Sequence, residues 1–283
     1  MARTVERIEE DIAALEEALS ALAAEISSAY TSYLNTLGPA VRKHLILASY
    51  HLCTQGYAKP FLSLSLNQRQ QLQHALRKLG QQASAQLLAY TRTEERGEVG
   101  GAGGAGEAGE AGEAESNSSP PPVHHLSLSA ASDACNPMEL AQWQHNLEQA
   151  IANTLKTVSR ETNHLLQQVG ILPNKLPGSL LEAAVNSSEA SAEAIAGPPN
   201  LLNLLIETEN SDESDDSNVT PIIAINLRLS EIEFADATVR AGRNQIRSFE
   251  VRLKSLGREY YKKQRERAVA EAEAAWRASW FEE

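Results

Sequence analysis

The sequence predicts an all-α, elongated helical and coiled-coil protein with two disordered, low-complexity linkers. Two seams of apolar residues, one at each end of the chain, carry this prediction, because alternating three- and four-residue steps let a helix pack along a partner helix. The composition agrees, since aromatic residues are only 5% of 283 residues and a large aromatic core is not expected. The predicted segments are 1–93, 94–134, 135–206, 207–219 and 220–283.

The first segment is predicted to contain a coiled-coil arm followed by a basic helical pair. The arm is expected to stop at Gly38-Pro39, since proline disrupts a helix interior. A second helix is predicted from there to about Cys53, and a third begins at Ser65 or Asn67, either of which can cap it. The seam of the arm consists of Val5, Ile8, Ile12, Leu15, Leu19, Leu22, Ile26, Ala29 and Tyr33.

The two linkers are predicted from their composition. Segment 94–134 carries eight acids and one arginine around a Gly-Ala-Glu repeat, and 207–219 carries six acids and no base. Neither has enough apolar surface to fold. Between the linkers, Asn136 is expected to cap a helix that ends at Gly170. A weaker helix is predicted over 180–195.

The last segment, 220–283, is predicted to be one long helix that begins near Thr220-Pro221. The stretch 222–230 also fits the alternating pattern of a strand. The helix is favoured there because the sequence offers no evident partner strand. The heptad seam consists of Ile232, Val239, Ile246, Leu253 and Tyr260, with Ala235, Gly242, Phe249 and Leu256 at the intervening positions.

The charges beside the two seams favour an antiparallel pairing of the arms with each other. A parallel zipper of the N-terminal arm with itself would bring Asp11 and Glu16 together. The acidic start of the chain would instead lie against the basic stretch 252–267, with both termini at one end. This pairing is expected within one chain or between two swapped chains. The longer C-terminal helix is expected to extend beyond the arm.

The motifs that could carry chemistry favour ordinary structural explanations. Residues 101–106 spell a dinucleotide-binding fingerprint, but they lie in a linker without the strand and helix that this motif requires. His44 and His51 are seven residues apart with no acid nearby, which is a poor metal-binding pattern. Cys53 has no evident base to activate it. We therefore expect no enzymatic activity, no cofactor and no bound metal.

Basic residues near the C-terminus and two tryptophans one turn apart are the candidate partner-binding features. Cations beside aromatic residues can hold phosphates, whereas the ordinary interpretation is a solvated helix face. The tryptophans favour docking to a partner, with packing against the Tyr30 and Tyr33 region as the alternative. The candidate partner-binding residues are Arg258, Lys262, Lys263, Arg265, Arg267, Trp276, Trp280 and Phe281.

These features predict a non-enzymatic coiled-coil scaffold or adaptor that binds a protein partner through its C-terminal helix, with a homo-oligomer as a further option. The alternative is a peripheral binder of nucleic acid or of an anionic membrane surface. That function would use the basic helix 240–267 and the segment 38–93, which has seven bases and no acid. With no leader and no long apolar run, the expected location is the cytoplasm, peripheral to a membrane under the alternative.

Overall fold

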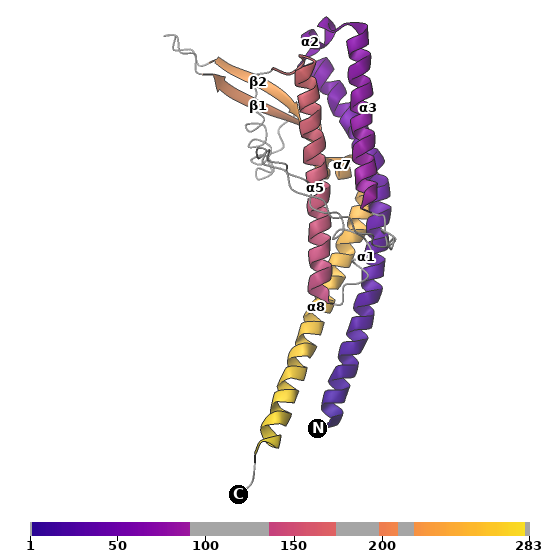
Figure 1. Cartoon of the computed structure of the whole chain (residues 1–283), viewed down its shortest axis with the longest axis vertical. Coiled ribbons are helices and arrows are strands. Elements are labelled where there is room, and N and C mark those ends of the chain that lie inside the picture. The colour runs from indigo at the N-terminus through magenta and orange to yellow at the C-terminus, as the bar shows by residue number, and fades with distance from the viewer. Residues whose placement is uncertain (1, 91–135, 174–197, 209–217, 281–283) are drawn as a thin grey trace, which may run out of the picture.

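The chain folds into an elongated bundle whose long helices lie along the molecular axis (Figure 1). The computed structural model describes residues 2–90, 136–173, 198–208 and 218–280. The all-α prediction is confirmed, with a two-stranded hairpin added to the helices. The long helices are α1 (Ala2–His51), α3 (Leu66–Ala89), α5 (Pro137–Gln168) and α8 (Ala237–Ala278).

Helix α1 is continuous over 50 residues, a length of about 75 Å at 1.5 Å per residue. The prediction that the first helix stops at Gly38-Pro39 is therefore wrong. Gly38 serves close packing instead, because a Cβ there would lie 2.6 Å from Ser84 Oγ on α3. A Cβ at Gly80 would likewise lie 3.0 Å from Arg42 Cγ. Close packing of α1 on α3 outweighs the local tendency of Pro39 to end a helix.

The chain reverses direction at the end of the bundle that carries α2 (Figure 1). A π-helical turn, η1 (Leu52–Gly56), leads from α1 into α2 (Ala58–Ser63). Ser65 then caps α3, as predicted. Its hydroxyl accepts from the backbone N–H of Gln68, and the Gln68 side chain accepts from the backbone N–H of Ser65. This reciprocal cap satisfies donors at the start of α3.

Helix α5 begins and ends where the sequence predicts. Asn136 Oδ1 accepts from the backbone N–H groups of Met138 and Glu139, both at 2.9 Å, and Pro137 occupies the first turn. The chain leaves the helix through Gly170, whose φ of +81° is in the left-handed region that glycine tolerates. The weaker helix predicted over 180–195 and the linker 94–134 lie outside the described residues.

An antiparallel hairpin replaces the first part of the predicted C-terminal helix. Strand β1 (Leu201–Thr208) pairs with β2 (Asn218–Ile225), and Leu201 lies opposite Ile225. The preference for a helix over 222–230 is therefore wrong, because the short apolar piece at 201–206 is the partner strand. The strands also take in both ends of the predicted spacer 207–219, of which residues 209–217 lie outside the described part.

Side chains of α5 continue the hairpin's hydrogen bonding. The Asn163 carboxamide donates to the carbonyl of Ile225 at 2.8 Å and accepts from its N–H at 2.9 Å. Ser159 Oγ accepts from the backbone N–H of Leu227 at 2.9 Å. These buried contacts satisfy backbone groups that a third strand would otherwise have to pair. They attach the base of the hairpin to the helical bundle.

The long C-terminal helix begins at residue 237 rather than near 220. A short helix, α7 (Leu229–Ala235), precedes it, and Asp236 between them has an extended backbone. The Asp236 carboxylate accepts from the N–H groups of Thr238 and Val239 and so caps α8. The heptad seam therefore crosses a break between helices, although both Ile232 and Val239 remain fully buried.

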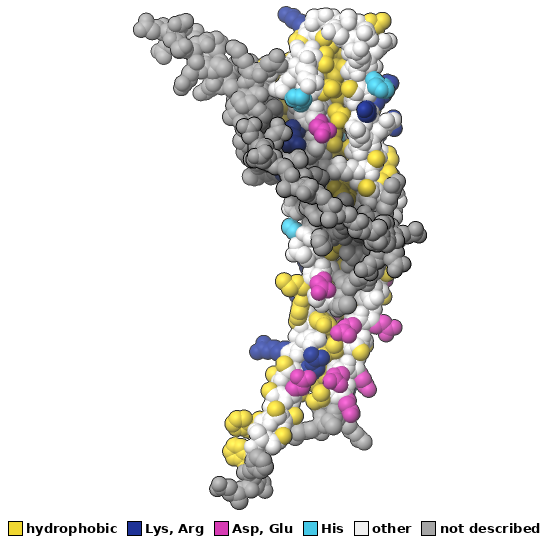
Figure 2. Space-filling view, in the orientation of Figure 1, with side chains coloured by type: hydrophobic (Ala, Val, Ile, Leu, Met, Phe, Trp, Pro, Cys, Tyr) yellow, Lys and Arg dark blue, Asp and Glu magenta, His cyan; other side chains and the backbone are white. Residues whose placement is uncertain are grey.

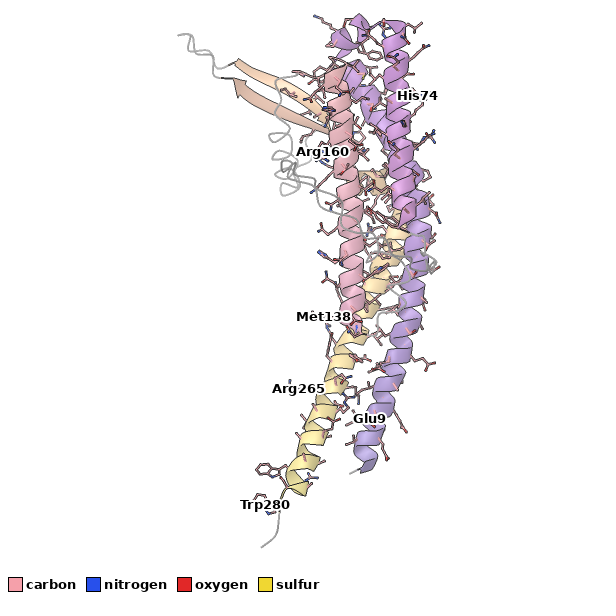
Figure 3. All side chains as sticks on the ribbon, in the orientation of Figure 1. Glu9, His74, Met138, Arg160, Arg265 and Trp280 are labelled. Carbon is pink, nitrogen blue, oxygen red and sulfur yellow. The ribbon has the colours of Figure 1, made fainter. Side chains whose placement is uncertain are left out.

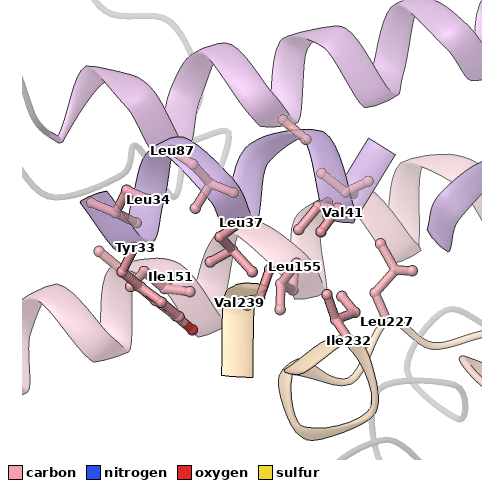
Figure 4. Close-up of a cluster of buried hydrophobic side chains, with 14 of the residues drawn as sticks. Tyr33, Leu34, Leu37, Val41, Leu87, Ile151, Leu155, Leu227, Ile232 and Val239 are labelled. Atoms are coloured by element: carbon pink, nitrogen blue, oxygen red, sulfur yellow. The ribbon is translucent and has the colours of Figure 1, made fainter. Parts of the chain in front are cut away.

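The apolar core follows the seams predicted for the two arms. Side chains from α1, α3, α5, α7 and α8 converge where these helices meet (Figure 4). Every position of the N-terminal seam is partly or fully buried. On α8, Ile246, Phe249 and Leu253 face the same core. The buried residues labelled in Figure 4 include Tyr33, Leu37, Ile151, Leu155, Leu227, Ile232 and Val239.

Candidate partner-binding face on α8

Helices α1 and α8 lie antiparallel, with both termini at one end of the molecule (Figure 1). Lys263 Nζ lies 2.9 Å from an Asp11 carboxylate oxygen, and Arg252 lies 2.6 Å from Glu25. The hydrogen bond to Asp11 raises the pKa of Lys263. The antiparallel orientation predicted from the charges is thus present within one chain. Exposed pairs of this kind each contribute only about 0.2–1 kcal/mol, so they set direction while the buried seam supplies stability.

The predicted overhang of the C-terminal helix is much shorter than expected. Because α1 continues through Pro39 and α8 begins only at residue 237, the two helices run together along most of α8. With Asp11 beside Lys263, the start of α1 lies near residue 272. Only the turns that carry Trp276 and Trp280 extend past it.

A buried polar cluster joins α1, α5, α7 and α8 near the middle of the bundle. Arg243, only 8% exposed, binds Glu148 through two nitrogens at 2.5 and 3.0 Å and Glu233 at 2.6 Å. Its guanidinium also lies over the Tyr33 ring, 4.7 Å from the centroid. The Tyr30 hydroxyl donates to Glu148, and that of Tyr33 donates to Glu233. We call these five residues the Arg243 cluster.

The Arg243 cluster is built for cohesion rather than reaction. Burial and the neighbouring carboxylates raise the pKa of both Tyr30 and Tyr33, so the phenols stay neutral and donate to the acids. The guanidinium makes four hydrogen bonds within the cluster. The sequence gave Arg243 no special signal, since it occupies a flanking position of the seam. Its partners Glu148 and Glu233 lie 95 and 10 residues away.

The side of α8 that faces away from the core carries a continuous row of exposed cations, valines and tryptophans. Its members recur at steps of three, four or seven residues, which keeps them on one face of a helix. None of the six cations has an ion-pair partner among the residues that the structure describes. We call this row the outer face of α8; it consists of Arg240, Arg247, Val251, Lys254, Arg258, Lys262, Arg265, Val269, Trp276 and Trp280.

Acidic residues lie elsewhere in this half of the molecule. They gather over the lower part of α1 in Figure 2, where the chain begins Glu6, Glu9, Glu10 and Asp11. The acids that α8 itself carries fall between the steps of its outer face. The face is therefore uniformly positive along six cations that span 25 residues, or about 38 Å.

The structure divides the predicted partner-binding residues into two groups. Arg258, Lys262, Arg265, Trp276 and Trp280 share the outer face. In contrast, Lys263 pairs with Asp11 and Glu266, and Arg267 pairs with Glu271. Phe281 lies outside the described residues.

Sequence reasoning missed three further members of the outer face. Arg240, Arg247 and Lys254 are exposed on the same side of α8 as Arg258. Their spacing of seven, seven and four residues was the available signal. It identifies a face only when the basic residues are placed around a helix instead of being counted along the chain.

The two tryptophans are presented to solvent. Trp276 and Trp280 are each 67% exposed, and their ring centroids lie 6.0 Å apart. Figure 3 places Trp280 and Arg265 on the side of α8 away from Glu9 of α1. The interpretation that the tryptophans pack against Tyr30 and Tyr33 is wrong, because those tyrosines are buried in the middle of the bundle.

The other residues weighed for chemistry lack the surroundings that chemistry needs. Burial raises the pKa of Cys53 to about 11, the opposite of what a nucleophilic thiol requires. Within the described ranges, no three His, Cys, Asp or Glu side chains gather as a metal site would require. An open groove of about 500 Å³ between α3 and α5 includes Lys78, Arg160 and Glu161. No nucleophile lies beside them.

Comparisons with known proteins return no match: no family model, no curated protein and no solved structure is similar to this chain. Among the described helices, none combines the length and the apolarity needed to cross a bilayer. The functional argument therefore rests on the surfaces that the fold presents.

Proposed function

We propose that this protein is a non-enzymatic helical scaffold that binds a protein partner through the outer face of α8. The observation that carries the proposal is the exposed row of cations ending in Trp276 and Trp280. One side of α8 is used to hold the bundle together, and the opposite side is left to solvent. The partner's matching surface is expected to be acidic and helical.

The spacing of the outer face supports a helical partner. Steps of three and four residues from Arg247 to Val269 are the steps at which two helices exchange side chains. The six cations select an acidic partner and speed its association, while the tryptophans supply apolar contact area. Exposed tryptophans are costly to leave in water, which favours their burial in a complex.

The experiment is an affinity capture with the full-length chain carrying R258E, K262E and R265E. A matched control carries R258K, K262R and R265K, which keeps every charge. We expect the reversed variant to lose at least about tenfold of the captured partner and the control to retain it, since three cations contribute to a desolvated charged interface. Circular dichroism should show both variants folded, because all three side chains are exposed.

A nucleic acid or other anionic polymer is the alternative ligand of this face, and the same variants distinguish it. Retention on heparin that collapses between low and moderate salt would indicate polymer binding through released counterions. A partner that survives nuclease treatment and moderate salt, and that is lost with W276A and W280A, supports the protein-binding function. Equal capture by the reversed variant and the control would overturn the proposal.

A further inference from the structure

The end of the bundle opposite the tryptophans presents a second set of exposed apolar side chains. Leu62 is 66% exposed and Leu66 is 70% exposed, one at each side of the turn between α2 and α3. Tyr50, near the end of α1, is 58% exposed. Lys59 is exposed one turn before Leu62 on α2. We call these four residues the α2 tip.

The leucines of the α2 tip are held outward by an ordered frame. Leu64 between them is buried in the core, so the extended turn points Leu62 and Leu66 the other way. Arg69 donates to the carbonyls of Phe61 at 3.2 Å and Leu62 at 2.6 Å, and its guanidinium lies 5.4 Å from the Phe61 ring centroid. The Ser65–Gln68 cap fixes the other side of the turn.

The surroundings of the α2 tip carry positive charge. Residues 26–93 include seven Lys or Arg and no acid. Along α1, Lys43 is exposed two turns before Tyr50, with Ile46 and Leu47 partly exposed between them. On the neighbouring α5, Glu161 lies in a groove that also contains Lys78 and Arg160. An apolar projection in a basic field is suited to an anionic, partly apolar surface.

We infer that the α2 tip docks on an anionic lipid surface, with Leu62 and Leu66 entering the boundary between headgroups and acyl chains. Lys59 and Lys43 would meet the headgroup charge, and Tyr50 is suited to the same boundary. A nucleic acid would use the cations but gain nothing from the leucines, which cannot stack on bases. The inference is independent of the α8 proposal, because the two surfaces lie at opposite ends of the molecule (Figure 1).

The test is vesicle flotation with the full-length chain, comparing phosphatidylcholine vesicles with vesicles that also contain phosphatidylserine. We expect binding to the anionic vesicles and at least about tenfold weaker binding for L62S combined with L66S, because partial burial of two leucines supplies that much affinity. The matched control is V251S combined with V269S, which removes two exposed apolar side chains from α8 instead. We expect the control to bind as the unmodified chain does.

Further arms separate the alternatives. Thermal unfolding should be unchanged by the leucine substitutions, since both side chains are mostly exposed, so lost binding would not reflect lost folding. The α8 variant with R258E, K262E and R265E should still float with anionic vesicles. Absence of binding to these vesicles, an equal loss in the valine control, or loss only in the α8 variant would each overturn the inference. So would oligonucleotide binding that reproduces the vesicle result and ignores L62S and L66S.

Discussion

The guanidinium of Arg243 joins acids from two different helices in the interior of the bundle. Replacing it with methionine keeps the apolar volume but leaves Glu148 and Glu233 without their cation. We expect R243M to lower the free energy of unfolding by about 3–5 kcal/mol, because breaking a buried pair leaves uncompensated charge. Urea denaturation followed by circular dichroism measures this.

Lysine at the same position provides the control. R243K retains the charge but loses the planar fork that reaches both carboxylates and Tyr33 at once. Its loss of stability should be smaller than that of R243M. Equal stability of R243M and the unmodified chain would show that the cluster contributes no cohesion.

His44 gives the fold a predictable response to acid. Burial and the nearby Lys43 lower the pKa of His44 below 6.5, against the opposing pull of Asp236 and Glu231. The folded chain therefore holds the imidazole neutral where the unfolded chain protonates it. This contribution to stability is fully present above about pH 6.5 and decreases as the pH falls below it.

The variant H44Q removes that titration. We expect the fall in unfolding free energy between about pH 7 and about pH 5 to be smaller in H44Q than in the unmodified chain. Urea titrations at the two pH values measure both slopes. Other acidic groups titrate equally in both proteins, so identical slopes would contradict the assignment to His44.

At the scale of the elements, the continuity of α1 makes Pro39 a position of unused stability. Proline removes one helical hydrogen bond and crowds the carbonyl four residues earlier. P39A is expected to raise the free energy of unfolding by about 1–3 kcal/mol, because the side chain is exposed and the helix is already formed. G38A should do the opposite, since its new methyl group would meet Ser84. Thermal and urea unfolding of both variants test this, and a helix that breaks in P39A would contradict it.

How far the elements could be predicted depended on how local their signals are. The caps at Ser65 and Asn136 were predictable because each bonds to backbone only two or three residues away. The hairpin was not, since the separation of its strands by an acidic stretch hid the pairing. The contact that anchors it joins Asn163 to Ile225, 62 residues apart.

The candidate site was predictable in part for the same reason. Five of the eight predicted residues share the outer face of α8, because helical spacing alone places them there. The pairing of Lys263 with Asp11 depends on how α1 is positioned, which no local pattern specifies. The Arg243 cluster draws on four elements and is equally invisible to local pattern. Close helix contact at Gly38 explains why a strong stop signal was misleading.

At the scale of the whole molecule, the contacts between α1 and α8 fix a register that cysteine pairs can test. Tyr260 hydroxyl lies 3.4 Å from Glu16, so L15C with Y260C should form a disulfide under mild oxidation. The pair I8C with Y260C is displaced by seven residues, about 10 Å, and should not. Both are made with Cys53→Ala and Cys135→Ser. A non-reducing gel should show a bridged monomer, whereas a bridged dimer would indicate exchange of arms between chains.

The unbroken course of α1 has a consequence for the distance between the two proposed contact surfaces. Its 50 residues form a strut about 75 Å long that ends near the α2 tip on one side and near the tryptophans on the other. A helix interrupted at Pro39 would have placed a hinge in this span. Without one, a molecule standing on a bilayer by its leucines would carry its tryptophan end at a constant height and act as a ruler for whatever it recruits.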